Sequence, residues 1–198
     1  IVVAGGEPFM RIQFFQMTKK YPDIIFLVFT NGLFINDETL QTIKAQKNIV
    51  LLLSLEGCEE ETDDRRGKGV YNRLQKTMAQ LHKNSFFFGT SLTLTSKNFE
   101  TITSESFIQS LVNLGCKFFM FLEYNPIKPN TEHLMITASQ REKIMDIIRS
   151  FRKKWPALFI EVPGHEDEIG GCLGAGKGFI HISAQGDLEP CPFAPYSD

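Results

Sequence analysis

The sequence of 198 residues lacks a long hydrophobic run and lacks an excess of charge of either sign. Its longest apolar run, Ile24 to Phe29, has six residues, whereas about 20 are needed to span a bilayer. The 21 basic and 23 acidic side chains give a formal net charge of -2. No basic stripe is available to track a phosphate backbone. We therefore expect neither a membrane nor a nucleic acid as a partner.

Cysteine is also scarce, with four residues at positions 58, 116, 172 and 191. Their irregular spacing in a chain of this size is not that of a disulfide-stapled domain, which favours a reducing, cytoplasmic compartment and free thiols. Hydrophobic residues make up 42% and charged residues 22%, as in ordinary globular proteins. The sequence opens at Ile1 inside an apolar run, so we expect a fragment of a longer chain.

Short apolar runs alternate with amphipathic stretches over the first 155 residues. The low polarity of the runs predicts buried strands at 1–4, 24–30, 49–55, 86–95 and 118–124. Helical spacing of apolar residues predicts helices at 9–20, 37–45, 70–83, 104–114 and 137–154. The last helix begins with Thr137 and Gln140 at the spacing of a capping box.

This alternation favours parallel strands joined by right-handed crossovers, in an α/β barrel or a doubly wound sheet. We predict an incomplete parallel (β/α) barrel over residues 1–155. The pattern changes after Trp155 and Pro156, where we place a second, smaller unit over residues 156–198. Within it, Gly186 and Asp187 predict the turn of a β-hairpin.

Polar residues and glycines follow the predicted strands, where the functional loops of parallel α/β folds lie. These positions are Gly5, Gly6, Glu7 and Pro8; Thr30 and Asn31; Ser54 and Glu56; Asn98; and Glu123 with Tyr124. Asn–Gly and Gly–Gly also form ordinary turns, and Ser or Asn often caps a helix. Taken singly, each residue is as consistent with a structural role as with a functional one. Five sets at equivalent strand ends favour a site.

The chemistry of these residues suits a zwitterionic nucleoside. The paired glycines let a ligand approach the backbone closely, and the carboxylate of Glu7 can receive an ammonium group. Ser54 and Arg66 can hold a carboxylate, and Glu56 can accept hydrogen bonds from ribose hydroxyls. We therefore predict a binding site formed by these strand ends.

Three motifs stand at these positions: Gly5-Gly6-Glu7-Pro8, Thr30-Asn31-Gly32, and Ser54-Leu55-Glu56-Gly57 followed by Asp63 and Arg66-Gly67. Together they resemble the radical SAM superfamily of iron-sulfur oxidoreductases, over essentially the whole chain. The resemblance implies an S-adenosylmethionine cofactor and a [4Fe-4S] cluster. It also implies that the intact enzyme generates a 5'-deoxyadenosyl radical that abstracts hydrogen from its substrate.

The resemblance further implies roles for individual residues. The glycine pair and Glu7 would contact the amino group of S-adenosylmethionine. Ser54 and Arg66 would hold its carboxylate or ribose, and Asn98 would add a polar contact. The peptide-modifying branch of the superfamily often has Asp where this chain has Glu56.

One departure from the superfamily bears on activity. Its defining Cys-x-x-x-Cys-x-x-Cys loop is absent, and Cys58 and Cys116 cannot replace it because they lie on separate elements. We expect the loop in the intact parent, with a flavodoxin or ferredoxin as electron donor, and we expect this chain alone to be inactive. Its open sheet edge would allow it to dimerise.

Cys172 and the segment from Gly186 to Cys191 resemble the start of a SPASM or twitch extension. In that resemblance Cys172 and Cys191 would ligate an auxiliary iron-sulfur cluster, because a hairpin brings two soft thiolates together. Two ordinary thiols or half of a zinc site are the alternatives. The extension favours peptide or protein modification, with a small-molecule substrate also open.

Two other functions fit the sequence. One is an acid-base barrel enzyme without a cluster, which would use Glu7, Glu56 and Glu123 as its carboxylates. The other is a zinc-stabilised, non-catalytic module built on Cys172 and Cys191. Acid-base chemistry does not require the downstream pair Asp63 and Arg66, which favours the radical SAM interpretation.

Overall fold

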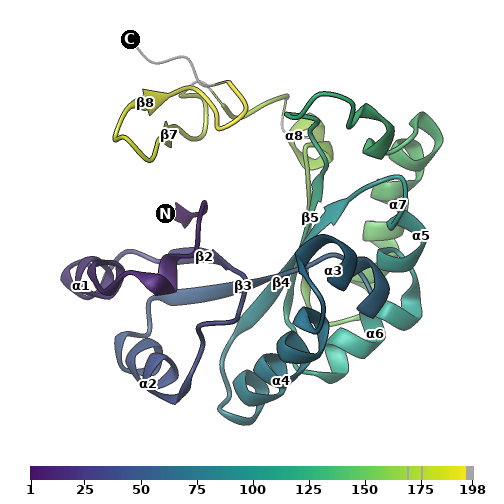
Figure 1. The fold of residues 1–198 in the computed structure, drawn as a ribbon. Helices are drawn as coiled ribbons and strands as arrows, with labels where there is room; N and C mark the ends of the chain where they lie inside the picture. Colours follow the sequence, from purple (N-terminus) through teal and green to yellow (C-terminus); the bar gives the residue numbers. More distant parts are fainter. Residues whose placement is uncertain (169, 175, 195–198) are drawn as a thin grey trace.

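A computed structural model of the chain describes residues 1–168, 170–174 and 176–194. Six parallel strands form one curved sheet in which spatial order equals chain order, and helices cover its convex side (Figure 1). The strands are β1 (Val2–Val3), β2 (Phe26–Thr30), β3 (Ile49–Leu55), β4 (Phe88–Leu94), β5 (Phe118–Glu123) and β6 (Leu158–Val162). The predicted incomplete (β/α) barrel is confirmed.

The helices are η1 (Pro8–Met10), α1 (Ile12–Lys20), α2 (Asp37–Gln46), α3 (Glu59–Arg66), α4 (Val70–Lys83), α5 (Phe99–Ile102), α6 (Glu105–Asn113), η2 (Glu132–Leu134), α7 (Ala138–Lys154) and α8 (Gly164–Glu168). All five predicted helices are present, and the capping box of Thr137 and Gln140 is formed. Helix α3 was not predicted because its sequence has no apolar face and buries only Thr62.

The strands are held together by packing on both faces of the sheet. On the helix-covered face, Phe119 and Phe159 stack with their ring centroids 4.8 Å apart and lie fully buried in the core. On the other face, Gly89 lies in register with Leu52 and Phe118. A Cβ atom on Gly89 would lie 2.3 Å from the backbone oxygen of Phe118. Only glycine therefore fits there.

The sheet continues past the boundary expected at residue 155. Strand β6 pairs in parallel with β5 from Leu158 to Val162. The change of pattern at Trp155 and Pro156 marks the end of helix α7 and not the end of the sheet. The sequence obscured this strand because its five residues include a buried glutamate, Glu161.

The predicted C-terminal hairpin is present. Strand β7 (His181–Ile182) pairs antiparallel with β8 (Leu188–Glu189), and Gly186 adopts a φ of 96° in the turn. The hairpin lies on the concave side of the sheet, away from the helix layer (Figure 1, yellow). No helix in the described part of the chain is long and apolar enough to cross a bilayer.

Candidate functional site

The loops that follow β1 to β4 form two clusters of polar residues at the C-terminal edge of the sheet. We call them the Glu7 corner (Gly5, Gly6, Glu7, Thr30 and Asn31) and the Glu56 corner (Glu56, Arg65, Arg66 and Asn98). The structure thus gathers most of the predicted site residues into these two clusters.

In the Glu7 corner, one carboxylate joins two loops. The Thr30 hydroxyl donates to Glu7 Oε1 at 2.8 Å, and the Asn31 N–H donates to Oε2 at 2.7 Å. The Phe9 N–H donates to Oε1 at 3.2 Å, so Glu7 also caps the short helix η1. Pro8 occupies the first turn of that helix and is buried. Glu7 therefore fixes the β1 loop against the end of β2.

The glycines beside Glu7 leave their backbone uncovered. Gly5 and Gly6 have φ values of 87° and 54°, in the left-handed region that favours glycine. A Cβ atom on either residue would meet no other atom within 4 Å. The space above this backbone is therefore open to a ligand.

Thr30 and Asn31 also shape their own turn. The Gly32 N–H donates to the Thr30 hydroxyl at 3.0 Å, and the Leu33 N–H donates to Asn31 Oδ1 at 2.9 Å. Side chains that hold a turn in this way are pre-positioned before any ligand arrives. Both residues thus have a structural role, and that role sets the position of Glu7.

In the Glu56 corner, two arginines share one carboxylate. Arg65 Nη1 lies 2.7 Å from Glu56 Oε2, while Arg66 donates through Nε at 2.9 Å and through Nη2 to Oε1. The Glu56 side chain is 2% exposed, and those of Arg65 and Arg66 are 43% and 25% exposed. The cluster therefore has a net positive charge that faces solvent, with its counter-charge buried.

Arg65 is the site residue that sequence reasoning missed. Its guanidinium lies over the ring of Tyr124, with 5.9 Å from Cζ to the ring centroid. The available signal was the doublet Arg65-Arg66, of which the motif singles out only the second residue.

Asn98 connects the β3 and β4 loops from a buried position. Its Nδ2 donates to the backbone oxygens of Glu56 at 2.7 Å and Thr93 at 2.8 Å. Its Oδ1 accepts from the N–H and the hydroxyl of Thr95, each at 2.8 Å. Two donors and two acceptor positions complete the capacity of an amide side chain. Asn98 therefore acts as a brace and has no hydrogen-bonding position left for a ligand.

Ser54 and Asp63 complete this part of the site. The Ser91 hydroxyl donates to Ser54 Oγ at 3.3 Å across the β3–β4 register, which leaves the Ser54 proton free to donate elsewhere. Asp63 accepts from the N–H of Gly69 at 2.5 Å and of Tyr71 at 2.9 Å, at the start of α4. These two backbone N–H groups, with Tyr71 contributing most, hold the pKa of Asp63 below its usual range.

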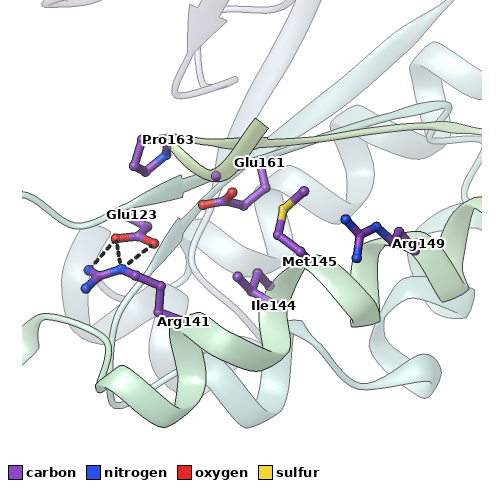
Figure 2. A pocket seen from close by; sticks show the side chains of 8 residues that line it. Glu123, Arg141, Ile144, Met145, Arg149, Glu161 and Pro163 are labelled. Atoms are coloured by element: carbon purple, nitrogen blue, oxygen red, sulfur yellow. Dashed lines mark hydrogen bonds and ion pairs between the residues drawn. The ribbon is translucent and has the colours of Figure 1, made fainter. Parts of the chain in front are cut away.

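Glu123 lies away from both corners. Its carboxylate pairs with Arg141 of α7, with 2.6 Å between Arg141 Nη2 and Glu123 Oε2 (Figure 2). The hydrogen bond to Glu123 is the main cause that raises the pKa of Arg141. The pair lines a cavity of about 240 Å³ between α7 and the ends of β5 and β6, together with buried Glu161. The expectation that Glu123 faces the mouth of the barrel is therefore wrong.

The two C-terminal cysteines both lie near Gly174. Cys172 Sγ and Cys191 Cβ lie 3.4 and 3.7 Å from the position that a Cβ of Gly174 would occupy. The Gly174 N–H donates to Cys172 Sγ at 3.3 Å. Within the described residues, no group of three His, Cys, Asp or Glu side chains is arranged to hold a metal ion.

The other two cysteines do not fit as cluster ligands. Cys116 is fully buried, and burial raises the pKa of its thiol to about 12, whereas iron binds the thiolate. Cys58 lies at the start of α3, and its pKa is raised by burial and by the nearby Glu61. Neither thiol therefore fits as a ligand of the [4Fe-4S] cluster that the resemblance implies.

Comparison with known proteins agrees with this geometry, although no family model matches the chain. It is similar to the AdoMet-dependent heme synthase of Methanosarcina barkeri, with 25% identity over 223 residues, 98% of this chain and 63% of that protein. The fold is similar to SuiB of Streptococcus suis bound to S-adenosylmethionine, with a TM-score of 0.73, 17% identity, and coverage of 96% and 48%. It is also similar to anSMEcpe with bound AdoMet and the Cp18Cys peptide, with a TM-score of 0.72, 15% identity, and coverage of 98% and 61%.

The curved parallel sheet and its strand-end motifs define an incomplete (β/α) barrel of the radical SAM type. Together with the sequence match, they support the resemblance to the radical SAM superfamily. The chain spans about half the length of SuiB and less than two thirds of the length of the heme synthase.

Proposed function

We propose that this chain forms the S-adenosylmethionine-binding part of a radical SAM enzyme. The observation that supports this most is the uncovered backbone of Gly5 and Gly6 beside the Glu7 carboxylate. A carboxylate has about four acceptor positions, and three protein donors occupy Glu7. One position is left for the ammonium group of the ligand.

The Glu56 corner supplies the opposite charge in this proposal. Two guanidinium groups on one carboxylate leave a net positive charge, which complements the carboxylate of S-adenosylmethionine. Ser54 can donate its hydroxyl proton to the same group. Glu56 then orients the two arginines and does not bind ribose itself, and Asn98 holds their loop in place.

The chemistry of the proposed enzyme depends on a group that this chain does not bind by itself. In the intact enzyme a [4Fe-4S] cluster would supply the electron for cleavage of S-adenosylmethionine, and a flavodoxin or ferredoxin would reduce that cluster. The residues of this chain bind and orient the nucleotide and exclude water from it. We expect no 5'-deoxyadenosine from this chain with S-adenosylmethionine and dithionite under anaerobic conditions, and its formation would contradict the cluster assignment.

We further propose that the intact enzyme modifies a peptide or protein and binds an auxiliary cluster. Support comes from the position of Cys172 and Cys191, both beside Gly174, and from two structural relatives, SuiB bound to the precursor peptide SuiA and anSMEcpe with a bound peptide. The heme synthase relative supports a small-molecule substrate instead. Iron content after anaerobic reconstitution tests the cluster: Cys172→Ser should lower it, while Cys116→Ser should not.

The acid-base alternative has less support because its three carboxylates have separate partners. Glu7 is bound by backbone N–H groups and a hydroxyl, Glu56 by two arginines, and Glu123 by Arg141 on the helix-covered side. No pair of these carboxylates shares a hydrogen-bond donor in the described structure.

Binding of S-adenosylmethionine by the chain, measured by titration calorimetry, tests the proposal. Gly6→Ala adds a methyl group that meets no protein atom, so we expect it to weaken binding about tenfold or more by obstructing the ligand. Gly186→Ala introduces the same kind of backbone strain in the hairpin, where the added methyl is equally unobstructed, and serves as the control. Equal affinity of the two variants would contradict the placement of the ligand.

A further inference from the structure

A second hollow lies at the end of the sheet opposite to the candidate site. It is a groove of about 440 Å³ between the C-terminal ends of α2 and α4 and the first residues of β3. Helices α2 and α4 both lie on the convex side of the sheet (Figure 1). Its volume is within the range of small-molecule sites, about 300 to 1,000 Å³.

Three lysines surround this groove without neutralising partners. Lys44, Lys47 and Lys83 line it together with no acidic residue. None of the three takes part in an ion pair found in the described residues. The chain as a whole has a formal charge of -2, so this concentration of positive charge is local. It favours an anionic ligand.

The rest of the groove is apolar. Ile43 and Ile49 are buried in its floor, whereas Phe87 is 53% exposed beside the lysines. Burial of an aromatic ring of this size contributes a substantial favourable free energy, which an exposed ring does not provide. A ligand with an apolar body would cover Phe87 while its anionic group meets the lysines.

Two residues of the groove have a left-handed backbone conformation. Lys47 and Ser85 have φ values of 63° and 58° and follow the last residues of α2 and α4 closely. Glycine is the usual residue at such left-handed positions, because a side chain adds strain there. A lysine near a helix C-terminus also offsets the helix dipole, but Lys44 and Lys83 already serve that purpose.

We propose that this groove binds a small molecule that has a phosphate or carboxylate group on an apolar, aromatic or aliphatic body. The site is separate from the S-adenosylmethionine site, which lies at the other end of the strands. Lysine suits such a ligand because its ammonium group acts as a mobile point charge toward phosphate or carboxylate.

The test is a titration of the isotope-labelled chain with phenyl phosphate, followed through backbone amide chemical shifts. We expect saturable shifts at Lys47, Ser85 and Phe87. Inorganic phosphate, which has only the anionic group, and phenol, which has only the aromatic ring, should bind more weakly. The absence of saturable shifts in the groove would overturn the proposal. Inorganic phosphate or phenol binding as tightly as phenyl phosphate would overturn the two-part recognition.

Lys47→Gly separates binding from folding. Loss of the left-handed strain should stabilise the fold. Loss of one ammonium group should weaken the binding of phenyl phosphate about tenfold. Lys76→Gln on the exposed side of α4, outside the groove, is the control and should leave the affinity unchanged. Unchanged affinity in Lys47→Gly, or the same loss in Lys76→Gln, would overturn the assignment of the lysines.

Discussion

The two corners of the candidate site differ in how much of their bonding is completed within the protein. The Glu7 corner has uncovered glycines and a carboxylate with one acceptor position left. The Glu56 corner has a buried carboxylate, two arginines and a brace, Asn98, whose amide is fully used. One corner is open to a ligand, and the other is a rigid support that presents positive charge.

This difference shows that residues of one motif set can have unlike roles. Glu7 and Glu56 both follow a parallel strand and both belong to a recognised motif, yet only the first is flanked by open backbone. We therefore expect substitutions in the Glu56 corner to reduce stability, and substitutions in the Glu7 corner to reduce ligand binding more than stability.

The largest loss of stability is expected for Glu56→Ala. The substitution leaves two guanidinium groups without their shared carboxylate, and loss of one partner of a buried pair costs about 3 to 5 kcal/mol. Because the arginines are 43% and 25% exposed, water solvates them partly, and we expect the low end, about 3 kcal/mol. Urea denaturation measures this change.

The exposed pair of Glu105 and Lys154 provides the control for that experiment. Both side chains are about half exposed or more, so Glu105→Ala should change the free energy of unfolding by less than about 1 kcal/mol. A Glu56→Ala variant as stable as Glu105→Ala would show that the Glu56 corner is not a structural support.

A smaller loss is expected for Asn98→Ala. It leaves the buried backbone oxygens of Glu56 and Thr93 and the N–H of Thr95 without their partner. Unpaired buried groups cost about 1 to 3 kcal/mol each, partly offset by water that enters the space, so we expect about 2 kcal/mol by urea denaturation. If Asn98→Ala instead abolished S-adenosylmethionine binding at unchanged stability, Asn98 would be a ligand contact and not a brace.

The smallest effect is expected for Asp63→Asn, and it depends on pH. Backbone N–H groups lower the pKa of Asp63 in the folded state, so its contribution to stability is present above the ordinary pKa of about 3.9 and is lost as pH falls below it. The stability difference between the native chain and Asp63→Asn should therefore shrink below about pH 4.

Thermal unfolding between pH 2.5 and 6 measures this dependence, with Asp64→Asn, a substitution of the adjacent exposed carboxylate, as the control. A difference that stays constant over this range would show that the N–H groups of Gly69 and Tyr71 do not stabilise the Asp63 carboxylate.

Much of the fold could be predicted because each buried strand is a short apolar run and each long helix has an apolar face. Helix α3 has neither signal, because its residues are almost all charged. Tertiary contacts of Thr62, Asp63 and the two arginines hold it in place instead. Strand β6 was missed as a part of the sheet because its five residues include a buried glutamate, Glu161.

The site could be predicted less completely than the fold. Sequence position identified the strand-end residues, but it could not distinguish Asn98, which is satisfied by four hydrogen bonds, from Ser54, which has a free proton. It also placed Glu123 on the wrong side of the sheet, because a residue at a strand end can face either side, and Arg141 lies on the helix-covered one.

We propose that the strand ends of this chain bind S-adenosylmethionine and that the Glu7 corner contacts it directly. Amide chemical shifts of the isotope-labelled chain, followed during titration with S-adenosylmethionine, test it most directly. We predict saturable shifts at Gly5, Gly6 and Asn31 that are larger than those at Asn98. Shifts confined to the Glu56 corner, or none at either corner, would contradict this mode of binding.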